Sequence, residues 1–156
     1  MNNQKVKYPC VILAGGKSSR MYYENKAFVK IKNHTLISRI IKKISNNNLP
    51  IAINANEHLD KFSKFGLEII KDKYVGHIGP LSGIYSALIW ANCLKYKWVF
   101  TFPCDVPFFP NDIFLKADNL LDDKAKNFDL ISVTSNLKKH HIISVSYTHL
   151  RAHETV

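Results

Sequence analysis

Two glycines followed by basic and hydroxyl side chains form the part of this sequence best suited to bind an anion. Gly15 and Gly16 end an apolar segment, then come Lys17, two serines and Arg20, with Lys26 a little further on. Because glycine has no Cβ, the backbone can turn sharply and a ligand can approach its N–H groups. N–H donors, hydroxyls and fixed positive charges together favour a polyphosphate. The alternative is a Gly-Gly turn followed by a solvated basic surface, because two glycines alone are a weak signal.

A carboxylate at the end of another apolar segment could hold a metal ion beside such phosphates. Asp105 follows a strand predicted over Trp98–Phe102 and lies between Pro103 and Pro107, which stiffen the backbone. Mg²⁺ prefers oxygen ligands and usually binds one or two carboxylates together with substrate phosphates. The alternative is that Asp105 caps a turn, but its place at the carboxyl end of a strand, together with the basic loop, favours the metal.

Two more polar residues, Asn54 and Asp72, follow other predicted strands. An amide offers both a donor and an acceptor, so Asn54 suits the edge of a base or a ribose. Considered alone, each of these residues is more often part of a turn. Their role therefore depends on whether the fold brings them to the glycine loop.

The elements that must position these residues alternate between strand and helix patterns. The predicted strands cover Tyr8–Leu13, Pro50–Asn54, Leu67–Ile70, Trp98–Phe102 and Phe128–Val133, with a brief extended piece at Phe28–Ile31. The predicted helices cover Thr35–Ser45, Asn56–Lys64, Pro80–Cys93 and a segment capped by Asn111. This alternation predicts an α/β fold with a mainly parallel sheet covered on both faces. Ligands then bind beyond the carboxyl ends of the strands, where the polar residues named above should share one crevice.

The predicted helix over Pro80–Cys93 has its large apolar side chains on one face. In Pro80–Cys93, the large apolar side chains fall on one face at helical spacing: Leu81, Ile84, Tyr85, Leu88 and Ile89. Pro80 suits the first turn, where its missing N–H does no harm. Gly83 lies inside the helix at a cost of about 1 kcal/mol relative to alanine. A close approach of a ligand or of another element is a reasonable explanation for this glycine.

The glycine loop and two later segments resemble a known enzyme family. The loop reads LAGGKSSRM followed by YYENK, and it resembles the signature of molybdenum cofactor guanylyltransferases, Leu-Ala-Gly-Gly-x-Ser-x-Arg-Met followed by Asp-Lys. The segments GPLSGI at 79–84 and FPCDVP at 102–107 are similar to further segments of that family. The resemblance runs from about Pro9 to about Ser144. It departs from the family pattern at Tyr22, where glycine is common, and at Asn25, where the family often has aspartate.

The resemblance implies a Rossmann-like three-layer α/β/α nucleotidyltransferase domain with a mainly parallel sheet. Such an enzyme transfers GMP from GTP to molybdopterin with Mg²⁺ and releases pyrophosphate. Its partners would be GTP and molybdopterin as substrates, proteins that handle molybdopterin, and molybdoenzymes. By resemblance, the catalytic residues are Lys26, Arg20 and Asp105, with Asp105 as the metal ligand. The positions that would bind the nucleotide are Leu13, Ala14, Gly15, Gly16, Lys26, Asn54, Asp72 and Asp105.

The chain is expected to form one domain over residues 1–144 that is incomplete at its C-terminal end. Family chains normally continue beyond residue 144, and the missing part would help to close the crevice. The last residues, 145–156, read VSYTHLRAHETV and resemble a translated sequencing adapter. We therefore expect this tail to be non-native.

Composition narrows the classes of function. Lysine and arginine number 22 against 12 acidic residues, and the resulting charge of +10 favours anionic partners. No block of like charges marks a nucleic-acid arm, and no apolar run is long enough to cross a membrane. Three scattered cysteines suggest reduced core thiols. We expect a soluble cytoplasmic monomer.

Three other functions stay open at this point. A cytidylyltransferase or a sugar-phosphate nucleotidyltransferase would use the same fold. A basic nucleic-acid-binding module would explain the charge and would lose affinity steeply with salt. A truncated regulatory fragment would bind nucleotide without turnover.

Overall fold

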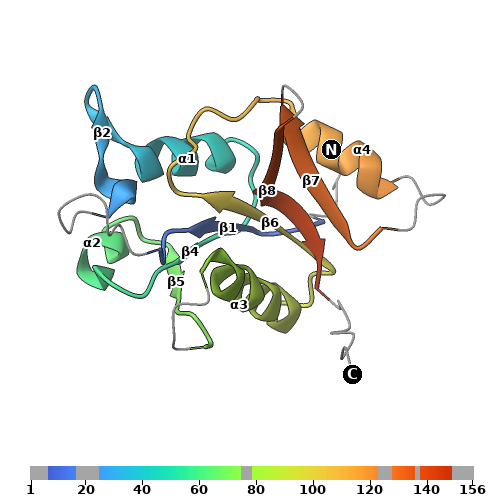
Figure 1. Cartoon of the computed structure of the whole chain (residues 1–156), viewed down its shortest axis with the longest axis horizontal. Helices are drawn as coiled ribbons and strands as arrows, with labels where there is room; N and C mark the ends of the chain where they lie inside the picture. Colours follow the sequence, from blue (N-terminus) through green and yellow to red (C-terminus); the bar gives the residue numbers. More distant parts are fainter. Residues whose placement is uncertain (1–6, 17–24, 75–78, 123–127, 136–137, 149–156) are drawn as a thin grey trace.

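The computed structural model describes residues 7–16, 25–74, 79–122, 128–135 and 138–148. Within them, six strands form one sheet in the order β5-β4-β1-β6-β8-β7 (Figure 1). These strands are β1 (Cys10–Leu13), β4 (Ile51–Asn54), β5 (Glu68–Ile70), β6 (Trp98–Pro103), β7 (Leu130–Ser135) and β8 (Lys138–Tyr147). The helices are α1 (Leu36–Ser45), α2 (Leu59–Ser63), α3 (Pro80–Cys93) and α4 (Ile113–Asp122). A 3-10 turn η1 (Lys26–Phe28) and a hairpin of β2 (Lys30–Ile31) and β3 (His34–Thr35) complete the described elements.

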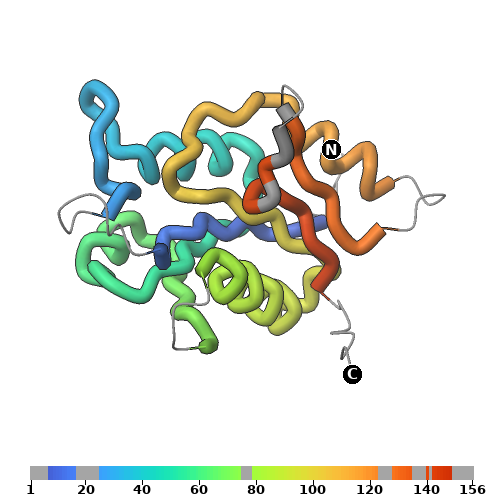
Figure 2. Tube along the Cα trace, in the orientation of Figure 1, coloured from blue at the N-terminus to red at the C-terminus, as the bar shows by residue number. Residues whose placement is uncertain are grey.

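Four neighbouring strands of the sheet are parallel, as the alternating pattern predicts. β1 lies at the centre, with β4 on one side and β6 on the other, and β5 pairs with the outer edge of β4 (Figure 2). β8 runs antiparallel to both β6 and β7. Because parallel strands end at the same edge of a sheet, the carboxyl ends of β5, β4, β1 and β6 lie side by side.

Helices cover both faces of this sheet, which confirms the three-layer α/β/α arrangement of Rossmann-like type. In Figure 1, α1 and α4 lie above the sheet and α3 lies below it. The upper core is rich in isoleucine and phenylalanine, and includes Ile37, Ile40, Ile44, Phe100, Phe102, Ile113 and Phe114. The lower core is smaller, and consists of Val11, Ala52, Ala87, Trp90, Ala91 and Val99. β1 is therefore buried on both faces, as its continuous apolar run indicates.

The amphipathic pattern correctly predicts α1. Thr35 precedes the helix, and its Oγ1 accepts a hydrogen bond from the N–H of Ser38 at 3.2 Å. This bond satisfies one of the N–H groups that the first turn leaves without an intrahelical partner. The residues at helical spacing, Ile37, Ile40 and Ile44, are fully buried against the sheet. The local cap and the apolar stripe thus specify the same segment.

The helix α3 packs on the sheet through its small residues and Trp90. Leu81 and Tyr85, which belong to the large apolar stripe, are 68% and 41% exposed. An amphipathic helix would bury that stripe, so the sequence pattern indicates the wrong face. The buried residues are Ser82, Gly83, Ser86, Ala87, Trp90 and Ala91. Because α3 is apolar nearly all round, periodicity alone could not identify the face that meets the sheet.

The last part of the sheet differs from the sequence-based elements. β7 begins at Leu130, not at Phe128, and it pairs with β8, a long strand that the strand patterns do not predict. Their register shifts between Ser132 and Val133. Val145 is buried in β8 and lies opposite Phe100 of β6. The structure therefore places the first residues of the expected tail in the sheet, while its non-native origin stays a prediction.

No helix in the described part of the chain has both the length and the apolar composition needed to span a membrane. The cysteines have three different environments: Cys10 is buried, Cys104 is partly buried and Cys93 is exposed. The expectation of core thiols is thus correct for Cys10 and wrong for Cys93.

Candidate functional site

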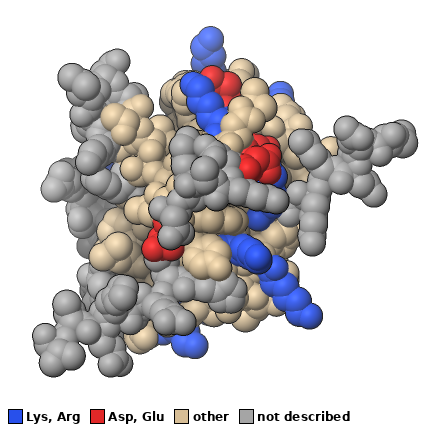
Figure 3. All heavy atoms as spheres, turned by 90° about the vertical axis from the view of Figure 1, so that its right-hand side faces the viewer, with Lys and Arg blue, Asp and Glu red and all other residues tan. Residues whose placement is uncertain are grey.

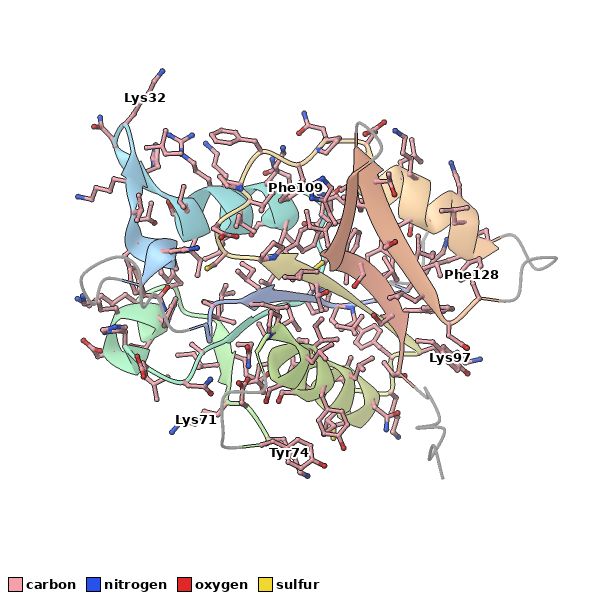
Figure 4. The ribbon with its side chains drawn as sticks, in the orientation of Figure 1. Lys32, Lys71, Tyr74, Lys97, Phe109 and Phe128 are labelled. Atoms are coloured by element: carbon pink, nitrogen blue, oxygen red, sulfur yellow. The ribbon has the colours of Figure 1, made fainter. Side chains whose placement is uncertain are left out.

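The structure brings most of the predicted site residues to the edge where the parallel strands end. Leu13, the last residue of β1, lies between Asn54, which ends β4, and Pro103, which ends β6. Asp72 follows the end of β5 by two residues, directly after Lys71, which is labelled in Figure 4. Asp105 follows the end of β6 by two residues. The crevice rule for parallel sheets therefore places both carboxylates at the edge that carries the glycine loop.

The sheet itself fixes the start of the glycine loop. The N–H of Ala14 donates to the carbonyl oxygen of Asn54 at 2.8 Å, which extends the ladder between β1 and β4 by one residue. This N–H is therefore used within the fold, and Gly15 and Gly16 are the next residues whose N–H groups could meet a phosphate. Ala14 is among the residues that the sequence predicts to bind the nucleotide, but its N–H is not available to a phosphate. Residues 17–20 of the motif, Arg20 among them, lie outside the described residues.

Asn25 fastens the far end of the loop to its beginning. The side chain is buried, and its Nδ2 donates to the carbonyl oxygen of Ala14 at 3.0 Å. Its Oδ1 accepts from the N–H of Ala27 at 3.0 Å and caps η1. The amide uses both a donor and an acceptor here, which an ionised aspartate could not do. The departure from the family pattern at this position thus has a structural role.

Lys26 and Asp105 face each other across the site. The Nζ of Lys26 lies 3.5 Å from an Oδ of Asp105, and both side chains are nearly half exposed. An exposed pair of this kind contributes little to stability. It does show that a cation from the glycine loop and a carboxylate from the β6 loop lie within reach of one phosphate group.

The loop that carries Asp105 is anchored by Phe109. Phe109 is buried, and its ring lies 4.7 Å from that of Phe102 in β6. On α1, Lys43 places its ammonium 4.5 Å from the centre of the Phe109 ring and donates to the Phe109 carbonyl oxygen. Figure 4 shows Phe109 on the α1 side of the sheet. Both ends of the loop are thus held, at β6 and at α1, and Asp105 lies between them.

A second cluster joins the ends of β4 and β5. Asn54 is 1% exposed, and its Nδ2 donates to one carboxylate oxygen of Asp72 at 2.8 Å and lies 3.2 Å from the carbonyl oxygen of Ile70. Asn56 donates from its Nδ2 to the other carboxylate oxygen of Asp72 at 3.0 Å. The Oδ1 of Asn56 in turn accepts from the N–H of Asp72 at 2.9 Å. The carboxylate of Asp72 is therefore held by two amides.

Two glycines make room for this cluster. A Cβ on Gly83 would lie 2.5 Å from the Oδ1 of Asn54, and a Cβ on Gly15 would lie 2.9 Å from the Nδ2 of Asn56. Neither glycine has a positive φ, so close approach explains them, not backbone strain. Gly83 thus lets α3 lie against the buried amide of Asn54. This identifies the close approach that the sequence suggests for this position.

The donor set at Asp105 suits a hard cation. Burial, and to a lesser extent the neighbouring Asp105 charge, raises the pKa of the Cys104 thiol to about 12, so Cys104 is neutral at physiological pH. The described residues contain no group of three or more His, Cys, Asp or Glu side chains that could hold a metal by themselves. The half-exposed carboxylate of Asp105 could supply one oxygen ligand to a hard cation such as Mg²⁺, which commonly completes its shell with water and phosphate oxygens.

Sequence reasoning missed two residues that shape the site. Asn56 lies two positions after Asn54, a spacing that places both side chains on one side of an extended chain. That alternation is the signal that could have identified it. The second is Ser86 of α3, whose Oγ accepts from the N–H of Lys73 at 2.9 Å and holds the segment after Asp72 against the helix. No sequence pattern marks Ser86, because the contact depends on which face α3 presents.

Comparison with known proteins identifies the family of this chain. Residues 10–153 match the model of the MobA-like NTP transferase domain. A probable molybdenum cofactor guanylyltransferase from Clostridium perfringens is 42% identical over 118 residues, which cover 76% of this chain and 57% of that protein. A molybdenum cofactor guanylyltransferase from Shewanella halifaxensis is 31% identical over 142 residues, which cover 91% of this chain and 68% of that protein.

A solved structure supports the fold. The crystal structure of Rv0371c from Mycobacterium tuberculosis superposes with a TM-score of 0.68 at 10% identity, and covers 91% of this chain and 72% of that one. This likeness concerns the fold alone. The chain spans little more than half the length of the Clostridium relative. The family match and the Shewanella relative both extend over most of this chain, which therefore belongs to the family of MobA-like NTP transferase domains.

Proposed function

We propose that this chain carries the nucleotide-binding part of an enzyme that transfers GMP from GTP to molybdopterin and releases pyrophosphate. The single observation that carries the proposal is the approach of Lys26 to Asp105 at 3.5 Å, beside the glycine loop. This pair offers a cation and a metal-binding carboxylate to one triphosphate. The names of the guanylyltransferase relatives support guanine as the base and molybdopterin as the acceptor.

The transfer requires positioning and charge neutralisation more than covalent catalysis. In the proposed complex, the N–H groups of Gly15 and Gly16 contact the phosphates, and Lys26, with Arg20, offsets the charge that grows on the departing pyrophosphate. Asp105 holds Mg²⁺, which when bound supplies positive charge at the phosphates. The attacking phosphate of molybdopterin is already ionised at neutral pH, so we propose no general base.

The base side of the site is proposed to lie at the ends of β4 and β5. Asn54 offers little of its surface, since it is buried and already bonded to Asp72. Asp72 is partly exposed and accepts hydrogen bonds, so it suits the N–H edge of guanine or a ribose hydroxyl.

We also propose a monomer in the cytoplasm. The unpaired cysteines, Cys10, Cys93 and Cys104, support a reducing compartment.

Thermal unfolding with different nucleotides tests the nucleotide part of this proposal. With Mg²⁺ present, GTP at 100 times its Kd stabilises the folded chain by about 2.7 kcal/mol, because the ligand binds the folded state alone. CTP and UTP should give no comparable shift. Asp105→Ala should abolish the Mg²⁺-dependent part of the shift while leaving the unliganded chain folded.

Incubation of the protein with GTP, Mg²⁺ and molybdopterin tests the reaction. The expected product is the guanine dinucleotide form of the cofactor, detected by mass. A shift with CTP in place of GTP would favour a cytidylyltransferase. Retention on nucleic acid at physiological salt without any response to GTP would favour a nucleic-acid-binding module. Binding of GTP without any product would favour a regulatory role.

A further inference from the structure

The carboxylate of Asp72 is held in one orientation from two sides. Asn54 donates to one of its oxygens at 2.8 Å and Asn56 donates to the other at 3.0 Å. Asn56 also accepts from the Asp72 N–H at 2.9 Å, so its amide binds both the side chain and the backbone of Asp72. A carboxylate has about four acceptor positions. The two amides occupy two of them, and their geometry fixes where the other two point.

The two asparagines contribute differently to this arrangement. Asn54 is buried between β4 and α3, and a change there would disturb the core. Asn56 is exposed, so a change there should disturb the core less. Its Nδ2 also lies where a Cβ on Gly15 would approach to 2.9 Å. Asn56 therefore lies between the glycine loop and Asp72, at the mouth of the candidate site.

We propose that Asn56 is a positioning residue for the choice of base. It holds the Asp72 carboxylate so that the open acceptor positions meet the donors of guanine. Guanine presents an N–H and an amino group on the edge where adenine presents an acceptor nitrogen, so an oriented carboxylate attracts the first base and repels the second. This inference rests on the proposed use of GTP, and it adds the residue that makes Asp72 selective.

Binding of GTP and ATP to the chain, measured by titration calorimetry with Mg²⁺, tests the inference. The wild type should prefer GTP, and Asn56→Ala should reduce the ratio of the two affinities about five- to tenfold, chiefly by weakening GTP. Asn56→Asp keeps the acceptor for the Asp72 N–H but places a second carboxylate against the first, so it should reduce the ratio further. Asn92→Ala is the matched control, since Asn92 is exposed at the opposite end of α3 and should leave both affinities unchanged.

A double-mutant cycle separates positioning from a general structural effect. If Asn56 acts through Asp72, Asn56→Ala should cause no further loss of preference in an Asp72→Ala background. Melting temperatures without ligand confirm that each variant is folded. An unchanged GTP preference in Asn56→Ala, or an equal loss in both backgrounds, would overturn the inference while leaving the proposed function intact. A wild-type chain that binds GTP no better than ATP would instead overturn the proposed function.

Discussion

At the scale of single residues, the site depends on amides in positions where carboxylates could stand. Asn25 donates to Ala14 and accepts from Ala27, and Asn56 both donates to Asp72 and accepts from it. An ionised aspartate can only accept, so it would match half of each arrangement. The chemistry of the amide, not merely the size of the side chain, therefore explains these two positions.

Asn25→Asp, which restores the residue common in the family, should destabilise this chain in a pH-dependent way. The ionised carboxylate would face the Ala14 carbonyl, at a cost of about 1–3 kcal/mol. The protonated form could donate again, so the folded state raises the pKa of the new carboxyl above its unfolded value. The stabilising bond is thus present at low pH and lost as the pH rises through the folded pKa.

The measurement is chemical denaturation at pH 5 and pH 8, with the wild type compared at each pH. The loss of unfolding free energy that Asn25→Asp causes relative to the wild type should be larger at pH 8. Asn25→Ala, which lacks both the donor and the acceptor, is the control and should show the same deficit at both values. Equal deficits for Asn25→Asp at the two pH values would show that the bond to Ala14 does not matter.

The three cysteines should react with thiol reagents in the order of their environments. Cys93 is exposed and should be modified first. Burial raises the pKa of Cys104 to about 12, so at pH 8 very little of it is the reactive thiolate. The pKa of Cys10 is also raised by burial. Peptide mass spectrometry after maleimide treatment should find Cys93 labelled alone at short times, and all three labelled in denaturant. Early labelling of Cys104 would contradict its environment in the fold.

At the scale of elements, the close approach of α3 to the sheet leaves no room for a larger side chain at Gly83. Gly83→Ala would gain about 1 kcal/mol of helix propensity, but the new Cβ would lie 2.5 Å from the Oδ1 of Asn54. Asn54 is buried and bonded, so either it or the helix must move, at a typical cost of 1–3 kcal/mol. We expect a net loss of stability and weaker GTP binding, measured by denaturation and calorimetry.

Gly16→Ala is the contrasting variant for Gly83→Ala. No atom of the described residues lies within 4 Å of a Cβ placed on Gly16, and its φ is not positive. The unliganded stability of this variant should therefore stay within about 0.5 kcal/mol of the wild type. If Gly83→Ala proved equally harmless, the packing of α3 against Asn54 would be looser than the structure indicates.

The elements also show what the sequence could and could not predict. α1 was predictable because Thr35 and the isoleucine stripe indicate the same segment, and the start of α3 followed from Pro80. The buried face of α3 was not predictable, because Leu81 and Tyr85 are as apolar as the residues that pack inside. β8 was missed because its serines Ser144 and Ser146 are buried together with Val145, so apolar side chains do not mark one buried face of the strand.

For the candidate site, the sequence could predict the positions of some residues but not their contacts. Asn54 and Asp72 could be placed because they follow apolar strand patterns and the ends of parallel strands meet. The bonds of Asn25 to Ala14 and of Asn56 to Asp72 could not be predicted, because each joins segments whose approach only the fold determines. Local patterns therefore identified the edge of the sheet that holds the site, whereas tertiary contacts determine how its side chains are held.

At the scale of the whole molecule, the charge of +10 attracts anions in general, whereas the candidate site is proposed to bind one kind of nucleotide. Figure 3 shows lysine and arginine side chains at several separate places on the visible face, with acidic side chains among them. A diffuse charge of this kind acts at long range and is screened over about 10 Å at 0.1 M salt. Contacts within the candidate site act at short range and are screened less.

Salt should therefore separate non-specific attraction from the proposed binding of GTP. At low salt, heparin or duplex DNA should bind the chain, and this binding should fall steeply as salt rises towards 0.5 M, because many counterions are released on binding. The thermal shift produced by Mg²⁺ and GTP should persist at 0.5 M, since it depends on a few fixed contacts. Asp105→Ala is the internal control: it should lose the Mg²⁺-dependent part of the GTP shift yet bind the polyanions at least as well, because it removes one negative charge. Polyanion binding that survives 0.5 M salt while the GTP shift disappears would reverse this assignment and favour a nucleic-acid-binding protein.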